Sequence, residues 1–226
     1  MDKTIWILIP AYNEEKMIGA VISELRSKGY MNILVVDDGS RDDTAKIAER
    51  AGAEVLRHLI NRGQGGALQT GLKYLAEEYS PEIIVTFDAD GQHQVEDLST
   101  LIKPIVEDKA DIVLGSRFLQ SKCRIPRIRR IILKLGILFT NIISNVHLTD
   151  THNGLRALGK KAYHSITITH RGMEHASDII DEIQKKNLKY CECPVTIVYS
   201  DYSKMKGQSS IGFIKMGLKI ILRKFM

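Results

Sequence analysis

The sequence predicts an α/β fold in which a mostly parallel sheet is flanked by helices, and three observations support this prediction. Strand-like and helix-like segments alternate over the first 115 residues, which is typical of parallel strands joined by right-handed crossovers. The strand-like runs are short and apolar. Polar clusters follow several of these runs where a strand would end, and open α/β sheets bind ligands at those ends.

The first part of the chain supplies three strands and three helices. Its strand-like runs read TIWILI, NILVV and EVLR. Helix-like segments separate these runs and continue the alternation. The expected strands are 4–9, 32–36 and 54–57, and the expected helices are 14–27, 43–51 and 67–79.

The next strand precedes the most informative motif of the chain. Residues 83–87 form a short apolar run that is bounded by Pro81 and Gly91, which predicts a buried strand. A helix is expected over 96–107 and a fifth strand over 111–114.

The alternation stops beyond Arg117. We expect one domain over residues 1–210 and a basic amphipathic helix over 211–226. The segments expected between the fifth strand and residue 200 are a basic loop, an apolar helix near 128–146, a polar loop, a helix near 176–186 and a strand near 190–199.

The composition is that of an ordinary globular protein with a basic surplus. Hydrophobic residues make up 44% of the chain, charged residues 26%, and the net charge is +5. The three cysteines form neither a disulfide framework nor a four-ligand zinc pattern. No uncharged run approaches the roughly 18–20 residues of a membrane span. Because helix-turn-helix, zinc-finger and RNA-binding signatures are also absent, we expect no nucleic-acid partner.

Polar clusters follow the first, second and fourth strands, and a glycine-rich loop follows the third. An Asp-x-Asp at a strand end can hold a divalent cation that in turn binds a diphosphate, and the start of a helix suits an anion. Each cluster alone could be a helix cap or a turn, but four on one sheet edge predict a binding site. Neither G-x-G-x-x-G nor a P-loop occurs. The clusters are PAYNEE (10–15), DDGS (37–40), NRGQGGAL (61–68) and FDADGQH (87–93).

These motifs, in this order, resemble those of the family-2 glycosyltransferases, which have a single nucleotide-sugar-binding α/β domain of the GT-A type. The match includes GSRF (115–118) and extends from about residue 4 to residue 210. DADGQH, TDTHNGLRA (149–157), ECPV (192–195) and KGQSS (206–210) indicate the polyprenyl-phosphate branch, which includes dolichol-phosphate mannose synthase. The resemblance implies an inverting, metal-dependent enzyme that moves a sugar from a UDP- or GDP-sugar to a lipid-linked acceptor. It therefore also implies two binding partners, the nucleotide-sugar donor and a lipid-phosphate acceptor.

The resemblance also implies roles for individual residues. Asp90 and Gln92, with Asp88, are expected to hold Mg²⁺ or Mn²⁺. The cation and Arg117 would then stabilise the negative charge that develops on the leaving diphosphate. The residues expected to bind the donor are Pro10, Tyr12, Glu14, Val36, Asp38, Asp88, Ala89 and Arg117.

The acceptor side is expected to involve the later motifs. Asp150, Arg156 and Lys206 are the candidates for acceptor binding. Asp178 matches the family's acidic position in the helix near 176–186, although it is the shorter carboxylate, and Glu174 is the alternative. A hydroxyl acceptor would require such a base. A polyprenyl phosphate would not, because the second pKa of a phosphomonoester is about 6.

Two stretches predict contact with a membrane. Over 128–139, apolar residues are packed between Arg129, Arg130 and Lys134, and within 211–226 a basic stripe is formed by Lys215, Lys219 and Arg223. Basic amphipathic helices lie in the lipid interface, which predicts a cytoplasmic protein bound peripherally at the inner face of the cell membrane. Packing on the domain itself or on a membrane partner protein would explain the same pattern.

Three other functions remain open from the sequence. Transfer could go to a sugar hydroxyl of a polysaccharide intermediate. A sugar-1-phosphate nucleotidyltransferase would require a Gly- and Arg-rich loop after the first strand, where the chain has PAYNEE. A non-catalytic nucleotide-sugar-binding subunit could lose its metal carboxylates, whereas Asp88 and Asp90 are present.

Overall fold

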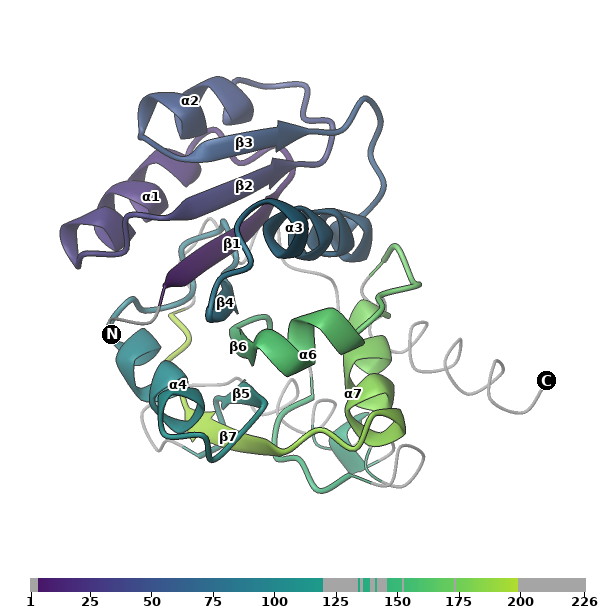
Figure 1. Cartoon of the computed structure of the whole chain (residues 1–226). Coiled ribbons are helices and arrows are strands. Elements are labelled where there is room, and N and C mark those ends of the chain that lie inside the picture. The colour runs from purple at the N-terminus through teal and green to yellow at the C-terminus, as the bar shows by residue number, and fades with distance from the viewer. Residues whose placement is uncertain are drawn as a thin grey trace.

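Seven strands form one sheet with the order β3-β2-β1-β4-β6-β5-β7 in the computed structural model of the chain (Figure 1). The predicted α/β fold with a mostly parallel sheet is therefore confirmed. No helix among the described residues is long and apolar enough to cross a membrane. The structure describes residues 4–119, 134, 136–138, 141, 146–151, 153–172 and 174–198.

All the strand pairs except those of β6 are parallel. β6 runs antiparallel to both of its neighbours, β4 and β5. The carboxyl ends of the parallel strands therefore share one edge of the sheet with the amino end of β6. The strands are β1 (Ile5–Ala11), β2 (Ile33–Asp37), β3 (Glu54–Arg57), β4 (Ile83–Thr86), β5 (Ile112–Ser116), β6 (Arg156–Gly159) and β7 (Tyr190–Pro194).

Helices cover both faces of the sheet and bury two hydrophobic clusters. One cluster lies beneath α1, α2 and α4, and the other lies beneath α3, α6 and α7 (Figure 1). The helices are α1 (Ile18–Ser27), α2 (Thr44–Arg50), α3 (Gln64–Glu78), α4 (Asp97–Val106), α6 (Lys160–Ser165) and α7 (His175–Lys185).

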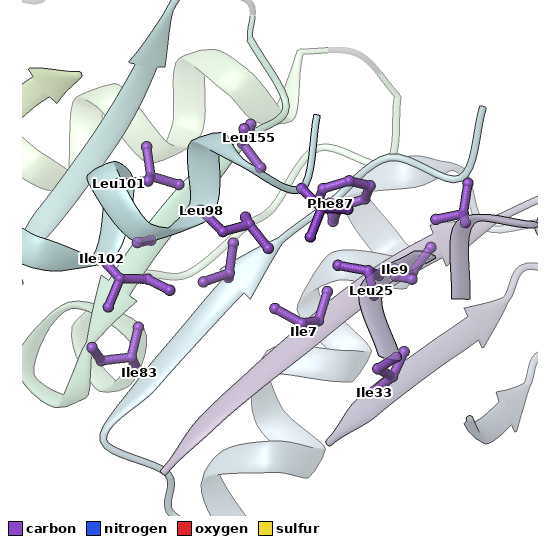
Figure 2. Packing of buried hydrophobic residues seen from close by; sticks show 14 of the residues in the cluster. Ile7, Ile9, Leu25, Ile33, Ile83, Phe87, Leu98, Leu101, Ile102 and Leu155 are labelled. Atoms are coloured by element: carbon purple, nitrogen blue, oxygen red, sulfur yellow. The ribbon is translucent and has the colours of Figure 1, made fainter. Parts of the chain in front are cut away.

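The central strand β1 shows how the sequence specifies these two layers. Ile7 and Ile9 enter the cluster beneath α1 and α4, whereas Trp6 and Leu8 enter the cluster beneath α3. This alternation is the two-residue period of a strand that is buried on both faces. Figure 2 shows Ile7 and Ile9 packed near Leu25 of α1. Burial of each such side chain contributes roughly 1.5–3 kcal/mol, so β1 fixes the position of the sheet edge that carries the polar clusters.

The structure differs from the sequence prediction mainly between residues 147 and 175. This region was expected to be a polar loop, but it contains β6 and α6. β6 has only four residues, which are buried on both faces, and so it shows no alternation. α3 begins at Gln64 rather than at residue 67, and α1 begins at Ile18 rather than at residue 14. Most of the helix expected near 128–146 and all of 211–226 lie outside the described residues, so the domain division at residue 210 stays a prediction.

Candidate active site

The ends of β1 and β2 are tied together just beyond the sheet. The N–H of Asn13 donates to Ser40 Oγ at 2.9 Å, and the N–H of Arg41 donates back to Asn13 Oδ1 at 2.9 Å. The N–H of Glu14 donates to Thr44 Oγ1 at 2.7 Å. Asn13 has a φ of 53°, which asparagine tolerates better than most residues. The PAYNEE and DDGS motifs therefore form one continuous polar edge.

The residues expected to bind the donor at this edge differ in exposure. Pro10 pairs with Val36 across the sheet, and both are buried. Val36 packs in the cluster beneath α3, and Ala89 packs in the cluster on the other face. Tyr12 is 41% exposed and Glu14 is half-buried. Tyr12 and Glu14 are thus the members of this group that present accessible side chains, while nucleotide contact stays a prediction for all five.

Asp38 organises the loop that follows β3. Its Oδ1 accepts hydrogen bonds from the N–H of Arg62 at 2.8 Å and from His58 Nδ1 at 2.7 Å. Its Oδ2 accepts from the N–H of Gly63 at 2.7 Å. Asp38 is 2% exposed, so its carboxylate serves contacts within the protein. Its expected contact with the nucleotide is untested and stays a prediction.

The glycines of the loop after β3 allow the protein's own backbone to approach closely, and the anion that the sequence predicts at the start of α3 stays a prediction. The N–H of Gly65 donates to the carbonyl of Arg171 at 2.9 Å. A Cβ on Gly65 would lie 2.0 Å from the carbonyl oxygen of His170, and a Cβ on Gly63 would lie 2.2 Å from that of Arg171. The glycines are therefore required for the close approach of the segment before α7.

Asp88, which follows β4, is held by two neighbours, and a glycine leaves room for its carboxylate. Gln64 Nε2 donates to Oδ1 at 3.0 Å, and His93 Nε2 lies 2.9 Å from Oδ2. A Cβ on Gly154 would lie 2.4 Å from Oδ2, so glycine is needed there. Burial by itself would raise the pKa of Asp88, but the interactions with His93, His175 and Arg156 outweigh it and hold the pKa below its usual value.

Asp90 lies in a different electrostatic environment from Asp88. Gln92 donates to it twice, from its backbone N–H to Oδ1 at 3.1 Å and from Nε2 to Oδ2 at 2.5 Å. Burial raises the pKa of Asp90, and so do the negative charges of Asp88 and Glu14. A divalent cation would relieve this repulsion, so the residues fit the metal that the sequence predicts. No cluster of three or more His, Cys, Asp or Glu side chains in the described part of the chain could hold a metal by itself.

Arg117 and Asp150 form a buried ion pair at the end of β5. Arg117 Nε donates to Asp150 Oδ2 at 2.6 Å, and Nη2 lies 3.4 Å from Oδ1. Their side chains are 8% and 1% exposed. The N–H of Asp150 donates to Glu192 on β7 at 3.0 Å, and burial raises the pKa of Glu192. Two expected site residues, one from the donor group and one from the acceptor group, are thus in direct contact.

Arg156 is the first residue of β6 and lies between Thr86 of β4 and Leu114 of β5. It is 3% exposed, and its Nη1 has no hydrogen-bond partner among the described residues. The same holds for Nδ2 of Asn153. Burial lowers the pKa of Arg156 to about 10, against the opposing charges of Asp88 and Asp150. An acceptor phosphate would have to reach a side chain that is almost fully enclosed.

Asp178 on α7 holds the segment that precedes this helix. Its Oδ2 accepts from the N–H of Thr169 at 2.8 Å and of His170 at 2.7 Å, and its Oδ1 lies 2.6 Å from His170 Nδ1. Burial alone would raise its pKa, but the hydrogen bonds from His170 and Thr169 lower it on balance. Glu174 is half-buried just before α7. The assignment of either carboxylate as a base stays a prediction.

The family described as "Glycosyl transferase family 2" matches residues 6–167 of the chain. The chain is a family-2 glycosyltransferase. An uncharacterized protein of Methanocaldococcus jannaschii is 40% identical over 225 residues, which cover 97% of this chain and 92% of that protein. The UDP-N-acetylglucosamine–dolichyl-phosphate N-acetylglucosaminyltransferase of Methanococcus voltae is 36% identical over 247 residues, covering 100% of this chain and 96% of that enzyme.

Further similarities agree with the branch and the fold. The undecaprenyl-phosphate mannosyltransferase of Micrococcus luteus is 31% identical over 213 residues, covering 88% of this chain and 86% of that enzyme. The resemblance to the polyprenyl-phosphate branch is therefore confirmed. The Mn²⁺ and UDP-glucose complex of Mycobacterium tuberculosis glucosyl-3-phosphoglycerate synthase has a TM-score of 0.74 at 19% identity, covering 97% of this chain and 77% of that chain. At this identity the likeness shows the fold alone.

The structure also brings residues to the site of this glycosyltransferase that the sequence did not single out. Gln64 contacts Asp88, and no pattern in the sequence distinguishes it from another loop residue. His175 on α7 is 4% exposed, and burial and the charge of Arg156 lower its pKa to about 4. The sequence prediction for residues 172–178 rests on the carboxylates Glu174 and Asp178, so it does not include this histidine. Lys206 lies outside the described residues, and its expected role stays a prediction.

Proposed function

We propose that the protein transfers a sugar from a nucleotide-sugar donor to a polyprenyl-phosphate acceptor, with inversion at the anomeric carbon and with a divalent cation. The main support is that the Asp88–Asp90 motif after β4 and the Arg117–Asp150 pair after β5 lie at the same edge of the sheet, on either side of β6. This edge combines carboxylates for a cation with an arginine for a phosphate. Similarity along the whole chain to a dolichyl-phosphate transferase supports the choice of acceptor.

The donor would be held by residues with distinct tasks. Asp90 and Gln92 are the proposed ligands of Mg²⁺ or Mn²⁺, because Asp90 lies among negative charges that a cation would offset. Asp88 is fixed by Gln64 and His93. It would lie against the ribose and diphosphate and beside the metal ion. When bound, the cation supplies positive charge to the departing diphosphate.

The base and ribose would lie over the joined ends of β1 and β2. Tyr12 offers an exposed ring for contact with the base. Glu14 can accept a hydrogen bond from the nucleotide, while the buried Pro10 and Val36 shape the floor beneath it. Asp38 would act by holding the loop at residues 61–63 beside this surface.

The transfer itself requires one displacement. An oxygen of the acceptor phosphate attacks the anomeric carbon, the bond from that carbon to the diphosphate oxygen breaks, and the nucleoside diphosphate leaves with the electron pair. Attack from the side opposite the leaving group inverts the anomeric centre. Arg117 would add positive charge beside the phosphates, and its pairing with Asp150 through Nε and Nη2 keeps the guanidinium in place. Since a phosphomonoester is largely ionised at neutral pH, no side chain has to remove a proton.

Transfer to a hydroxyl is the alternative, and one observation favours retaining it. Asp178 and His170 form a hydrogen-bonded carboxylate–imidazole pair at 2.6 Å, and such a pair can accept a proton from an attacking hydroxyl. Glu174 would be the other candidate base. Family membership and the glycosyltransferase relatives argue against the nucleotidyltransferase and non-catalytic alternatives.

We also propose that the protein works at the inner face of the cell membrane, in the synthesis of a cell-surface glycan. A long-chain lipid acceptor requires the enzyme to reach a bilayer. The basic, apolar stretches at 128–139 and 211–226 would make that contact, directly or through a membrane partner protein. Co-sedimentation of the full chain with anionic and neutral vesicles checks this: binding that requires anionic lipid is expected, and no binding to either would contradict direct contact.

A donor and acceptor screen tests the proposed function. The purified full chain would be incubated with UDP- and GDP-sugars, with Mg²⁺ or Mn²⁺, and with either a polyprenyl phosphate or a saccharide hydroxyl acceptor. We expect sugar transfer to the lipid phosphate and release of the nucleoside diphosphate. Transfer only to hydroxyl acceptors would overturn the lipid-phosphate acceptor while leaving the family assignment intact.

A further inference from the structure

Glu192 lies on β7, the edge strand that runs parallel to β5 (Figure 1). In the register of these two strands it pairs with Leu114, which is three residues before Arg117. The side chain of Glu192 is half-buried, and the proposed transfer step does not use its carboxylate. Its hydrogen bonds lead instead to the turn that carries Arg117.

The carboxylate of Glu192 binds two successive residues of the segment before β6. The N–H of Thr149 donates to Oε2 at 2.8 Å, and the N–H of Asp150 donates to Oε1 at 3.0 Å. The hydroxyl of Thr149 also donates to Oε1 at 3.0 Å. Because an ionised carboxylate only accepts hydrogen bonds, this one side chain satisfies three donors of the segment and fixes its backbone.

One path from Glu192 to the turn at residue 117 runs through two hydroxyl groups. Thr149 Oγ1 lies 2.6 Å from Ser116 Oγ, and the N–H of Phe118 donates to Ser116 Oγ at 3.2 Å. Since the single proton of the Thr149 hydroxyl is directed to Glu192, Ser116 is the donor between the two hydroxyls. The residues on both sides of Arg117 are therefore tied to Glu192.

A second path reaches the side chain of Arg117. Glu192 holds the backbone of Asp150, and the carboxylate of Asp150 accepts from Arg117 at its N–H, at 3.2 Å, and at Nε, at 2.6 Å. Asp150 and Arg117 are both buried, so the position of the guanidinium depends on where the backbone of Asp150 is held. We call the following residues the β7 clamp: Ser116, Arg117, Thr149, Asp150 and Glu192.

We propose that Glu192 is a positioning residue that fixes the guanidinium of Arg117 beside the phosphates by anchoring Thr149 and Asp150. The inference deepens the proposed function and rests on it, because Arg117 serves transfer only if phosphates bind at this edge. A charge that is already in place stabilises the departing diphosphate without reorganisation during the reaction. Glu192 itself touches no substrate in this role.

A positioning role has a consequence that a purely structural role lacks. If Glu192 acts through Arg117, its loss lowers the turnover of the folded enzyme. The same loss has little effect once Arg117 no longer carries a charge. A residue that serves folding alone would lower the unfolding temperature and leave the turnover of the folded enzyme unchanged.

Kinetic measurements on full-length variants test the proposal. Glu192→Ala removes the carboxylate, and Glu192→Gln keeps its length and one acceptor oxygen. Arg117→Gln removes the charge but keeps a donor for Asp150. Glu54→Gln is the matched control, because Glu54 is a half-buried carboxylate on the opposite edge strand, β3, where it accepts a hydrogen bond from the Tyr79 hydroxyl at 2.8 Å. The readout is kcat for transfer to a short polyprenyl phosphate.

We expect Glu192→Ala to lower kcat by about 10- to 100-fold, because misplacing a group at the reaction centre by about 1 Å can cost about 100-fold. Glu192→Gln should lose less, and Glu54→Gln should match the wild type. In the Arg117→Gln background, Glu192→Ala should change kcat by less than about twofold, since the two residues act as one unit. An unchanged kcat in Glu192→Ala would overturn the proposal, and so would an equal loss in both backgrounds.

Two further measurements keep the test decisive. If Glu192→Ala fails to fold, Glu192→Gln is compared in the same two backgrounds. Thermal unfolding of Glu192→Gln, Thr149→Val and the double variant needs no substrate, and we expect non-additive losses because the two side chains are in direct contact. Additive losses would refute the β7 clamp, whereas a wild type that transfers no sugar with any donor and acceptor would refute the proposed function.

Discussion

Gly154 lies directly against the carboxylate of Asp88, so a single added methyl group tests whether that carboxylate must stay where it is. A Cβ at residue 154 would lie 2.4 Å from Oδ2 and 2.7 Å from Oδ1, and real Cβ atoms essentially never approach a neighbour closer than 3.0 Å. In Gly154→Ala, the carboxylate of Asp88 or the backbone at residue 154 must therefore shift by at least the difference between 2.4 and 3.0 Å.

The size of the effect follows from the hydrogen bonds that the movement disturbs. Asp88 is held by His93 at 2.9 Å and by Gln64 at 3.0 Å. A hydrogen bond to a charged group contributes about 1.5–3 kcal/mol, so loss of one should lower the free energy of unfolding by about that amount. The same loss expressed in ligand binding is about 10- to 100-fold, because 1.4 kcal/mol corresponds to a factor of ten.

The assay compares Gly154→Ala with Gly159→Ala at the other end of β6. A Cβ on Gly159 would lie 3.1 Å from Ile105 Cγ2, an apolar atom that can shift slightly. Denaturant unfolding gives the free energy of unfolding, and calorimetric titration with Mn²⁺ and nucleotide gives the free energy of binding. If Gly154→Ala binds the nucleotide as tightly as Gly159→Ala does, binding does not require the carboxylate of Asp88 to stay in place, and the reasoning is refuted.

Three more predictions address neighbouring residues. Asp90→Asn should abolish metal-dependent transfer while leaving the unfolding midpoint almost unchanged; full activity in that variant, or wild-type activity in excess chelator, would sink the metal-dependent mechanism. Asp150→Asn leaves Arg117 buried without its anion and should lower the free energy of unfolding by about 3–5 kcal/mol, measured by urea titration; a change below 1 kcal/mol would contradict a buried pair. His175 has its pKa lowered to about 4 in the folded protein, against about 6.5 when unfolded. As the pH falls, the unfolded state takes up this proton at a higher pH than the folded state does. The contribution of neutral His175 to the free energy of unfolding is therefore present above pH 6.5 and is lost as the pH falls toward 4. His175→Phe should flatten the pH dependence of unfolding in that window, and an unchanged slope would argue against it.

The sequence was sufficient to predict that the polar motifs share one edge of the sheet, because strand ends have a strong local signature. β-Branched runs such as the one that ends at Thr86 stop abruptly at polar motifs, and parallel strands bring those motifs together. The position of Asp88 and Asp90 at the end of β4 followed from this alone. The family resemblance then supplied candidate roles that the chemistry of single residues could not.

The residues that support the motifs could not be found in this way. β6 has four residues and no alternation, so the position of Arg156 between β4 and β5 depends on tertiary pairing. The glycines at 63 and 65 predict close approach, but the approaching group is the backbone before α7, more than 100 residues later. Such contacts are set by packing rather than by local sequence pattern.

The central claim is that one sugar residue moves onto a lipid phosphate, and the mass of the lipid product tests it most directly. The full-length enzyme would be incubated with a nucleotide sugar, Mn²⁺ and a short polyprenyl phosphate, and the lipid fraction analysed by mass spectrometry. We predict a product heavier than the acceptor by one sugar, still with a single phosphate, and none with the chelator present. A product with a second phosphate, or glycosylation of saccharide hydroxyls alone, would contradict the account.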